Sequence, residues 1–316
     1  MYNGYSGNIL RVDLSTGAVT REPLDIQMAE DFVGGRGLAS RLLCTEIDPA
    51  VDPLGPENPL IFGTGPLTGS GAPATSRYVV VCKAPLTGTI ACSNSGGFFG
   101  PELKFAGYDF LIIQGESAEP VYLWISDRTV EIRSAEALWG EFPAATEAAL
   151  RRLTRATAKV ACIGPGGERL SLLAGVVNDG YRLAARSGVG ALMGKKKLKA
   201  IAVHGSGSVR LHDSEQFWSA TMDMHEKIAA DPVSFGSFRA YGTASLVNLI
   251  NEMGAYPTRN FQYDTFEGAA NTSGEAVVED ILQRNRACFA CPIACTRVSE
   301  VKDGPYKGRG EGPEYE

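Results

Sequence analysis

Short apolar runs separated by glycine-rich turns fill the first two-thirds of the chain. Residues 9–14 alternate between apolar and polar positions, pass a Ser-Thr-Gly turn and continue into residues 18–21, which predicts a β-hairpin. Later runs predict strands at 60–63, 78–82, 110–113, 121–125, 129–132, 160–163, 172–177 and 198–203. Helices are predicted at 38–43, from 101 onward and over about 144–155. The pattern therefore predicts a β-rich domain.

A helical period replaces these strand-length runs after residues 205–208, whose Gly-Ser-Gly-Ser sequence indicates a domain boundary. Asp213 and Gln216 form a capping box for a first helix, which ends at Pro232. The apolar positions of this helix and of a second one are Phe217, Ala220, Met224, Ile228, Leu246, Leu249, Ile250 and Met253. A third helix is predicted to begin at Ser273 and to deliver the chain to a cluster of cysteines.

The fold class predicted from these patterns is α+β, with a β-rich domain over 1–207 and the start of a mostly helical domain over 208–316. The chain has 37 glycines and 17 prolines, and their excess falls in the loops of the β-rich part. A formal charge of −6, from 30 basic and 36 acidic residues, favours neither nucleic acid nor an anionic membrane as a partner. No apolar run approaches the roughly 18 residues that a membrane span needs, and the N-terminus lacks the features of a signal peptide.

The seven cysteines are unevenly distributed. Four lie singly in apolar or small-residue contexts and are predicted to be buried free thiols: Cys44, Cys82, Cys92 and Cys162. An odd count and the absence of a secretory signal argue against a disulfide framework, so we expect a cytoplasmic protein.

The other three cysteines, Cys288, Cys291 and Cys295, follow the spacing C-x2-C-x3-C, with a proline and small residues between them. Several sulfurs can converge on one small object from such a segment, and soft thiolates favour iron–sulfur clusters, zinc or Cu(I). A cubane cluster takes four cysteines, and no cysteine follows Cys295. The segment thus supplies three ligands of a four-ligand site.

The glycine-rich loops do not match nucleotide-binding motifs. The glycines at 188, 190 and 194 have one residue too many for the dinucleotide fingerprint, and residues 190–196 are one residue short of a P-loop. Arg77, Arg182 and Arg186 interrupt glycine- and alanine-rich backbone, which suits anionic groups such as phosphates. Asn94, beside Gly96, offers donors and an acceptor to the edge of a heterocycle. The alternative is a set of tight turns with salt-bridged arginines.

An ordered set of motifs closely resembles the aldehyde:ferredoxin oxidoreductase family. The motifs are GPLTG at 65–69, PLTG at 85–88, NSGGFFG at 94–100, ELKFAGYD at 102–109, RSGVGALMG at 186–194, the three cysteines and EGPEYE at 311–316. The resemblance runs from the opening hairpin to the last residue. It implies a tungsten enzyme with a bis-pterin cofactor (tungstopterin, with or without magnesium) and one [4Fe-4S] cluster, in which a β-rich domain cradles the pterins.

The resemblance also implies roles for particular residues. Arg77 would lie between the pterins, Asn94 and Gly96 would contact a pterin, and the second loop would contribute Arg182, Leu183 and Ala185. Cys288, Cys291 and Cys295 would ligate the cluster, and Glu316 would lie beside the tungsten as a proton acceptor. Ferredoxin is the implied electron acceptor and an aldehyde the implied substrate, in a homodimer or with electron-transfer subunits.

Departures from the family pattern concern the cradle and the end of the chain. Thr75 and Ser76 stand where the family often has two glycines, and Ala185 stands where glycine is common. The family continues well beyond residue 316 and supplies the fourth cysteine there, so the sequence resembles an N-terminal half.

Two other functions remain open from the sequence. The first keeps the family and changes the reaction to reduction of a carboxylic acid or of an aromatic acyl thioester. The second is a non-enzymatic domain whose cysteines bind zinc, with an acidic C-terminal segment that is merely solvated.

Overall fold

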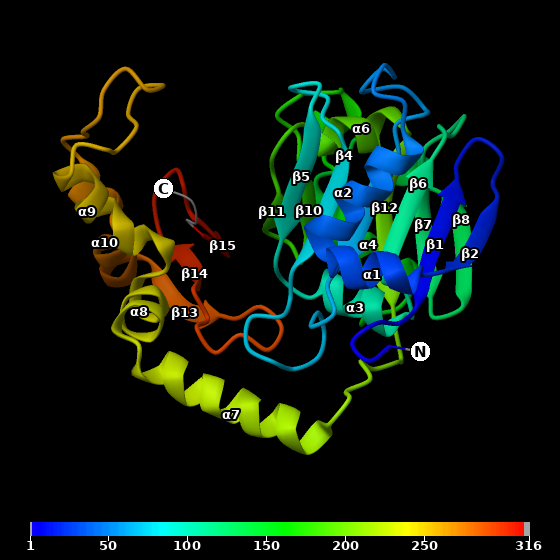
Figure 1. Cartoon of the computed structure of the whole chain (residues 1–316). Helices are drawn as coiled ribbons and strands as arrows, with labels where there is room; N and C mark the ends of the chain where they lie inside the picture. The colour runs from blue at the N-terminus through cyan, green and yellow to red at the C-terminus, as the bar shows by residue number, and fades with distance from the viewer. Residues whose placement is uncertain (1, 313–316) are drawn as a thin grey trace. The chain divides into compact units, whose positions relative to one another are not determined.

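The computed structural model describes residues 2–312, which form two compact units, Met1–Ser214 (unit 1) and Glu215–Glu316 (unit 2). Figure 1 shows the elements of each unit. Helix and strand together confirm the predicted α+β class.

Unit 1 is built on two six-stranded mixed sheets. The first has the order β2 (Val19–Pro23), β1 (Asn8–Asp13), β6 (Phe110–Gln114), β3 (Leu60–Thr64), β4 (Tyr78–Lys83) and β5 (Ile90–Ser95). The second has the order β11 (Arg182–Ala184), β10 (Val176–Asn178), β9 (Lys159–Cys162), β12 (Leu198–His204), β7 (Val121–Ser126) and β8 (Thr129–Ser134). The pairs β1–β6 and β7–β12 are parallel, and the other pairs are antiparallel.

Helices lie between the two sheets and over their outer faces. α3 (Phe99–Phe105) and α6 (Val189–Lys195) contact strands of both sheets and share one apolar core with them. α1 (Ile26–Phe32) and α2 (Gly35–Glu46) cover the outer face of the first sheet, and α4 (Pro143–Leu153) packs on the second. Full burial of each large aliphatic side chain in these layers contributes about 1.5–3 kcal/mol.

The short elements η1 (Glu136–Leu138) and α5 (Pro165–Glu168) complete unit 1. Buried ion pairs join its loops. Lys104 Nζ lies 2.5 Å from Asp109 Oδ1 and donates to the Gly65 carbonyl, while Asp109 accepts the backbone N–H groups of Ser6 and Gly7. A second buried pair, Lys199–Glu168, ties α5 to β12. These charges are buried with partners because an unpaired buried charge is costly.

Most predicted strands of unit 1 are present, beginning with the hairpin β1–β2. The run at 172–177 is shorter than predicted, because residues up to 175 form a turn and only Val176–Asn178 pairs as β10. The segment at 188–194, interpreted as a glycine loop, contains helix α6. Its glycines permit close packing, since a Cβ at Gly190 would lie 2.5 Å from the Gly175 carbonyl oxygen.

α7 (Ser214–Ala230) begins at the last residue of unit 1 and lies otherwise in unit 2. The start of this helix confirms the predicted helix start to within one residue. Short helical elements follow: η2 (Pro232–Ser237), α8 (Phe238–Tyr241), η3 (Thr243–Leu246), α9 (Val247–Glu252), η4 (Ala269–Thr272) and α10 (Gly274–Asp280). A three-stranded antiparallel sheet then follows, with the order β13 (Leu282–Arg286), β14 (Thr296–Val301) and β15 (Gly308–Glu311).

This small sheet was not predicted. The third helix ends at Asp280, so β13 rather than the helix delivers the chain to the cysteines. β13 has the sequence LQRNR and lacks apolar alternation, which is why the periodicity gives no strand signal there. None of the helices within residues 2–312 is both long and apolar enough to cross a membrane.

Candidate functional site

Two terminal strands, β5 and β11, lie next to each other at one edge of unit 1 (Figure 1). The backbone N–H of Arg186, after β11, donates to Ser93 Oγ in β5 at 2.9 Å. The predicted cofactor contacts lie on these strands and beside them: Arg77, Asn94, Gly96, Arg182, Leu183 and Ala185. The structure therefore brings both predicted loops to one edge of the unit.

Arg77 immediately precedes β4, and Asn94 lies on the neighbouring β5, where it pairs with Val79. The Arg77 guanidinium donates from Nη1 to Asn94 Oδ1 at 2.7 Å, and both side chains are exposed. Because the amide oxygen accepts this bond, the side chain of Asn94 holds the guanidinium in place. The edge thus carries a positioned positive charge, which suits an oxyanion such as phosphate.

A buried polar network holds the glycine loop that follows β5. Asn178 Oδ1 accepts hydrogen bonds from Tyr78 Oη at 3.0 Å and Ser95 Oγ at 2.8 Å. Asn178 Nδ2 donates to the Gly96 carbonyl at 2.9 Å and to Asp179 Oδ2 at 2.8 Å. Burial raises the pKa of Tyr78, which keeps its hydroxyl protonated as a donor. Asn178 therefore joins β10 to the loop that carries Gly96.

Asp179 extends this network. Its Oδ2 atom accepts the backbone N–H of Phe98 at 2.7 Å, and its own backbone has φ of 50°. A Cβ at Gly97 would lie 2.2 Å from the same Oδ2 atom, and Gly97 has φ of 93°. Only glycine therefore allows the loop to approach the carboxylate this closely.

A second carboxyl group, Glu147 of α4, lies behind the network. Burial, and next the negative charge of Asp179, raise the pKa of Glu147. Arg151, at 3.5 Å, and the backbone N–H of Gly180 act in the opposite direction. Glu147 thus lies close to the turn between β10 and β11, which carries Asp179 and Gly180.

The three clustered cysteines lie half-buried on the loop between β13 and β14 of unit 2. Ala290 and Ala294, which precede two of them, have φ of 50° and 51°, so the backbone turns tightly. Guanidinium groups hold the carbonyls of this loop. Arg239 donates to Pro292 at 2.6 Å, and Arg297, fully buried, donates to Ala294 at 2.8 Å.

Thiolates on a tightly wrapped loop are the donor set that an iron–sulfur cluster requires. Across residues 2–312, no three Cys, His, Asp or Glu side chains converge closely enough to hold a single metal ion. Glu316, the predicted proton acceptor, lies outside the described residues.

The sequence reasoning missed Asn178 and Asp179. Their role depends on partners about 80 to 100 positions away, such as Gly96 and Tyr78. The available signal was a pair of polar residues directly after an apolar run, at the end of a strand. Buried polar residues at such positions are hydrogen-bonded as a rule.

Comparisons with known proteins cover nearly the whole chain. The family model for the aldehyde ferredoxin oxidoreductase N-terminal domain matches residues 9–205, and that for domains 2 and 3 matches residues 219–316. The chain is 51% identical to the tungsten-containing aldehyde ferredoxin oxidoreductase of Thermococcus kodakarensis and 49% identical to that of Pyrococcus furiosus. Each alignment covers 100% of this chain and 52% of the relative. The chain thus spans about half the length of these relatives.

More distant similarities extend beyond aldehyde enzymes. The chain is 31% identical to the WOR-like subunit of the aliphatic sulfonate oxidoreductase of Pyrococcus furiosus, over 99% of this chain and 52% of that one. Among solved structures, it is similar to the active-site complex BamBC of benzoyl coenzyme A reductase bound to 1,5-dienoyl-CoA. That similarity has a TM-score of 0.81 at 31% identity and covers 96% of this chain and 48% of the other.

Proposed function

The chain belongs to the aldehyde ferredoxin oxidoreductase family, and we propose that it forms the cofactor-binding part of a tungsten enzyme that oxidises aldehydes to carboxylic acids. The observation that carries this proposal is the meeting of the Arg77–Asn94 pair and the β11 loop at one edge of unit 1. Positive charge, an amide and glycine backbone at one edge suit a phosphate-bearing pterin. Relatives about half identical in sequence are named for this activity.

Aldehyde and water give a carboxylic acid, two protons and two electrons in the proposed reaction. When bound, a tungsten–pterin group would supply the two-electron oxidation. Arg77 would hold pterin phosphates, with or without magnesium, and Asn94 and Gly96 would contact a heterocycle edge. Arg182, Leu183 and Ala185 would line the pterin cradle from the other loop. Glu316 is the proposed proton acceptor.

We further propose that Cys288, Cys291 and Cys295 supply three ligands of a [4Fe-4S] cluster that passes electrons singly to ferredoxin. The contacts of Arg239 and Arg297 to the carbonyls of the cysteine loop support this assignment, because they hold the loop in its wrapped form. The fourth ligand is proposed to come from the part of the full-length protein that follows residue 316.

Elemental analysis of the anaerobically prepared full-length protein tests the proposal. We expect tungsten and iron in a ratio near one to four, and aldehyde-dependent reduction of ferredoxin with formation of the acid. Absence of both tungsten and molybdenum would refute the pterin assignment. A colourless protein that contains zinc in place of iron would refute the cluster assignment.

A second reaction has support from the similarity, at a TM-score of 0.81, to the solved BamBC complex of benzoyl coenzyme A reductase. Reduction of an aromatic acyl thioester would use the same tungsten–pterin group and iron–sulfur cluster. Electrons would then flow from the cluster to the substrate. Identity near 50% to the aldehyde enzymes, against 31% to the reductase, favours aldehyde oxidation. Product analysis with a panel of aldehydes and aromatic acyl thioesters distinguishes the two.

A further inference from the structure

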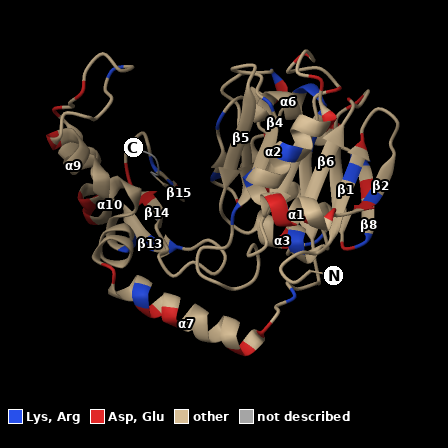
Figure 2. Cartoon of the chain, viewed as in Figure 1, with Lys and Arg blue, Asp and Glu red and all other residues tan. Residues whose placement is uncertain are grey.

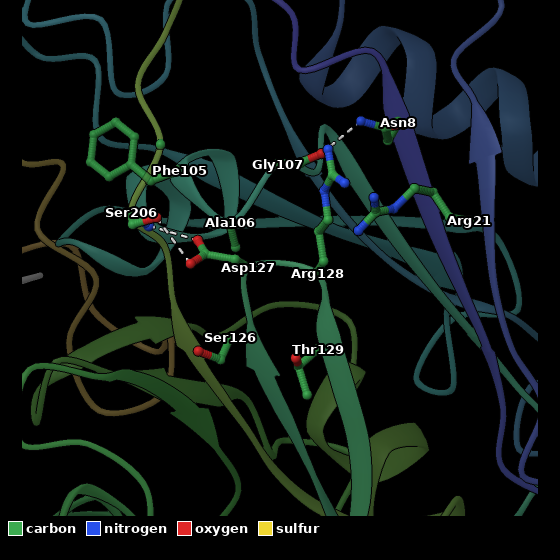
Figure 3. A pocket seen from close by; sticks show the side chains of 11 residues that line it. Asn8, Arg21, Phe105, Ala106, Gly107, Ser126, Asp127, Arg128, Thr129 and Ser206 are labelled. Atoms are coloured by element: carbon green, nitrogen blue, oxygen red, sulfur yellow. Dashed lines mark hydrogen bonds between the residues drawn. The ribbon is translucent and has the colours of Figure 1, made fainter.

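A pocket of about 640 Å³ lies in unit 1 (Figure 3). The strand orders of the two sheets place it at the edge opposite β5 and β11. Asn8 and Arg21 come from β1 and β2, which end the first sheet on the side away from β5. Ser126, Arg128 and Thr129 come from the β7–β8 hairpin, at the matching end of the second sheet. The pocket is therefore separate from the proposed pterin edge.

Arg21 is held in a defined position at this pocket. Its guanidinium lies 5.0 Å from the centre of the Tyr108 ring, and its Nη2 donates to Tyr108 Oη at 2.6 Å. Tyr108 is only 1% exposed. The stacked and hydrogen-bonded tyrosine thus orients an otherwise exposed positive charge, which lowers the entropic cost of binding an anion.

Arg128 is presented by a tethered turn. It follows Asp127 at the tip of the β7–β8 hairpin, where Ser126 pairs with Thr129. Asp127 accepts hydrogen bonds from the backbone N–H and the hydroxyl of Ser206, at 2.7 and 3.0 Å. The carboxylate nearest to Arg128 in sequence therefore accepts hydrogen bonds from Ser206. These two hydrogen bonds fix the turn that carries Arg128.

Arg21 and Arg128 differ from neighbouring arginines because they form no ion pair among the described residues. Basic and acidic residues lie beside one another on β1, β2 and β8 (Figure 2). Arg11 pairs with Glu22 at 3.0 Å and with Glu46 at 2.9 Å, and Arg133 pairs with Glu131 at 2.8 Å. Within the described part of the chain, no carboxylate forms an ion pair with Arg21 or Arg128. Arg21 and Arg128 thus line one pocket without an ion pair, and Asp127, the carboxylate that also lines it, is hydrogen-bonded to Ser206.

We propose that this pocket binds the phosphate group of a small molecule through Arg21 and Arg128. Guanidinium groups match phosphate oxygens in two-point hydrogen bonds, and a dianion relieves the repulsion between two like charges. The hydroxyls of Ser126 and Thr129 and the amide of Asn8 provide further polar lining. The volume falls within the range of small-molecule sites, about 300–1,000 Å³. Free phosphate and a phosphate ester share this chemistry.

Calorimetric titration of the full-length protein with inorganic phosphate, pyrophosphate and glycerol phosphate tests the proposal. We expect one site per chain, and weaker binding at higher salt because the contacts are ionic. Arg128→Ala should weaken binding about tenfold or more, and Arg21→Ala with Arg128→Ala should abolish it. Tighter binding of the ester than of inorganic phosphate would identify an ester as the ligand class, and the reverse would identify the free ion.

Arg133→Ala is the matched control, because Arg133 lies on β8 of the same hairpin and is paired with Glu131. It should bind phosphate as the unmodified protein does. Arg128 is exposed on a turn, so Arg128→Ala should leave the melting temperature unchanged. If Arg21→Ala unfolds, Arg21→Lys replaces it, because lysine keeps the charge but cannot form the two-point hydrogen bond. No binding by the unmodified protein, or equal binding by Arg128→Ala, would overturn the proposal. Neither result would affect the proposed oxidoreductase function.

Discussion

Arg77 is a single exposed side chain whose position depends on one hydrogen bond to Asn94. Removing it in Arg77→Ala deletes one positive charge of the proposed pterin edge. A hydrogen bond between charged groups contributes about 1.5–3 kcal/mol, so we expect pterin affinity to fall roughly 10- to 150-fold. Pterin released on denaturing the full-length protein measures this loss. Arg152→Ala, an exposed arginine of α4, should keep its full pterin content.

Asn178 links four buried groups through one amide. Asn178→Ala would leave Tyr78 Oη, Ser95 Oγ and the Gly96 carbonyl without this partner. We expect a loss of stability of about 2–4 kcal/mol, because buried unsatisfied groups are costly. Urea unfolding of the full-length protein measures it. The exposed Asn271→Ala should differ from the unmodified protein by less than about 0.5 kcal/mol, and an equal effect of both changes would contradict the network.

Glu147 provides a pH-dependent test. Its pKa in the folded protein is raised above 4.5, chiefly by burial, so the folded state holds the proton more tightly than the unfolded state does. Its contribution to stability is therefore fully present below pH 4.5 and is lost as the pH rises through the folded-state value. Glu147→Gln should stabilise the protein at neutral pH and have little effect below pH 4.5.

Thermal unfolding at a series of pH values measures the effect of Glu147→Gln. Glu136→Gln, at an exposed position of η1, serves as the control and should leave the melting temperature unchanged at both acidic and neutral pH. A stabilisation by Glu147→Gln that is the same at all pH values would show that ionisation is not its cause.

At the scale of elements, helix α6 depends on glycine for its place between the sheets. A Cβ at Gly194 would lie 2.0 Å from the Gly167 carbonyl oxygen, so Gly194→Ala must push α5 and α6 apart. We expect destabilisation of about 1–3 kcal/mol, typical of overpacking. Chemical denaturation measures it. Gly166→Ala, with no atom within 4 Å of its Cβ, is the matched control and should be nearly neutral.

Hydrophobic periodicity was sufficient to predict some strands but not others. The alternation at 9–14 and the apolar run at 78–82 predicted β1 and β4, because each strand buries its own side chains against a core. β13 and β15 have polar or glycine-rich sequences and exist through pairing with β14. Their strand form follows from long-range hydrogen bonds, which no local pattern records.

At the scale of the whole molecule, unit 1 contains its own cores on both sheets, drawn from residues before 215. A segment of this kind is expected to fold alone. We predict that residues 1–214 give a cooperative thermal transition and a circular dichroism spectrum with both helix and strand. A gradual, non-cooperative loss of signal on heating would show that unit 1 needs the rest of the protein.

The sequence by itself determined the family resemblance and the α+β class, because motifs and periodicity are local properties of a chain. The resemblance also supplied the residues that are proposed for both cofactor sites. The tertiary structure alone decided which distant residues meet. Asn178 reaches Gly96 across 82 positions, and Arg21 and Arg128 line one pocket from two different sheets. Such meetings arise from how two sheets pack around shared helices. This packing decides which polar groups are buried and which charges are paired, and the spacing of residues in the sequence does not predict either.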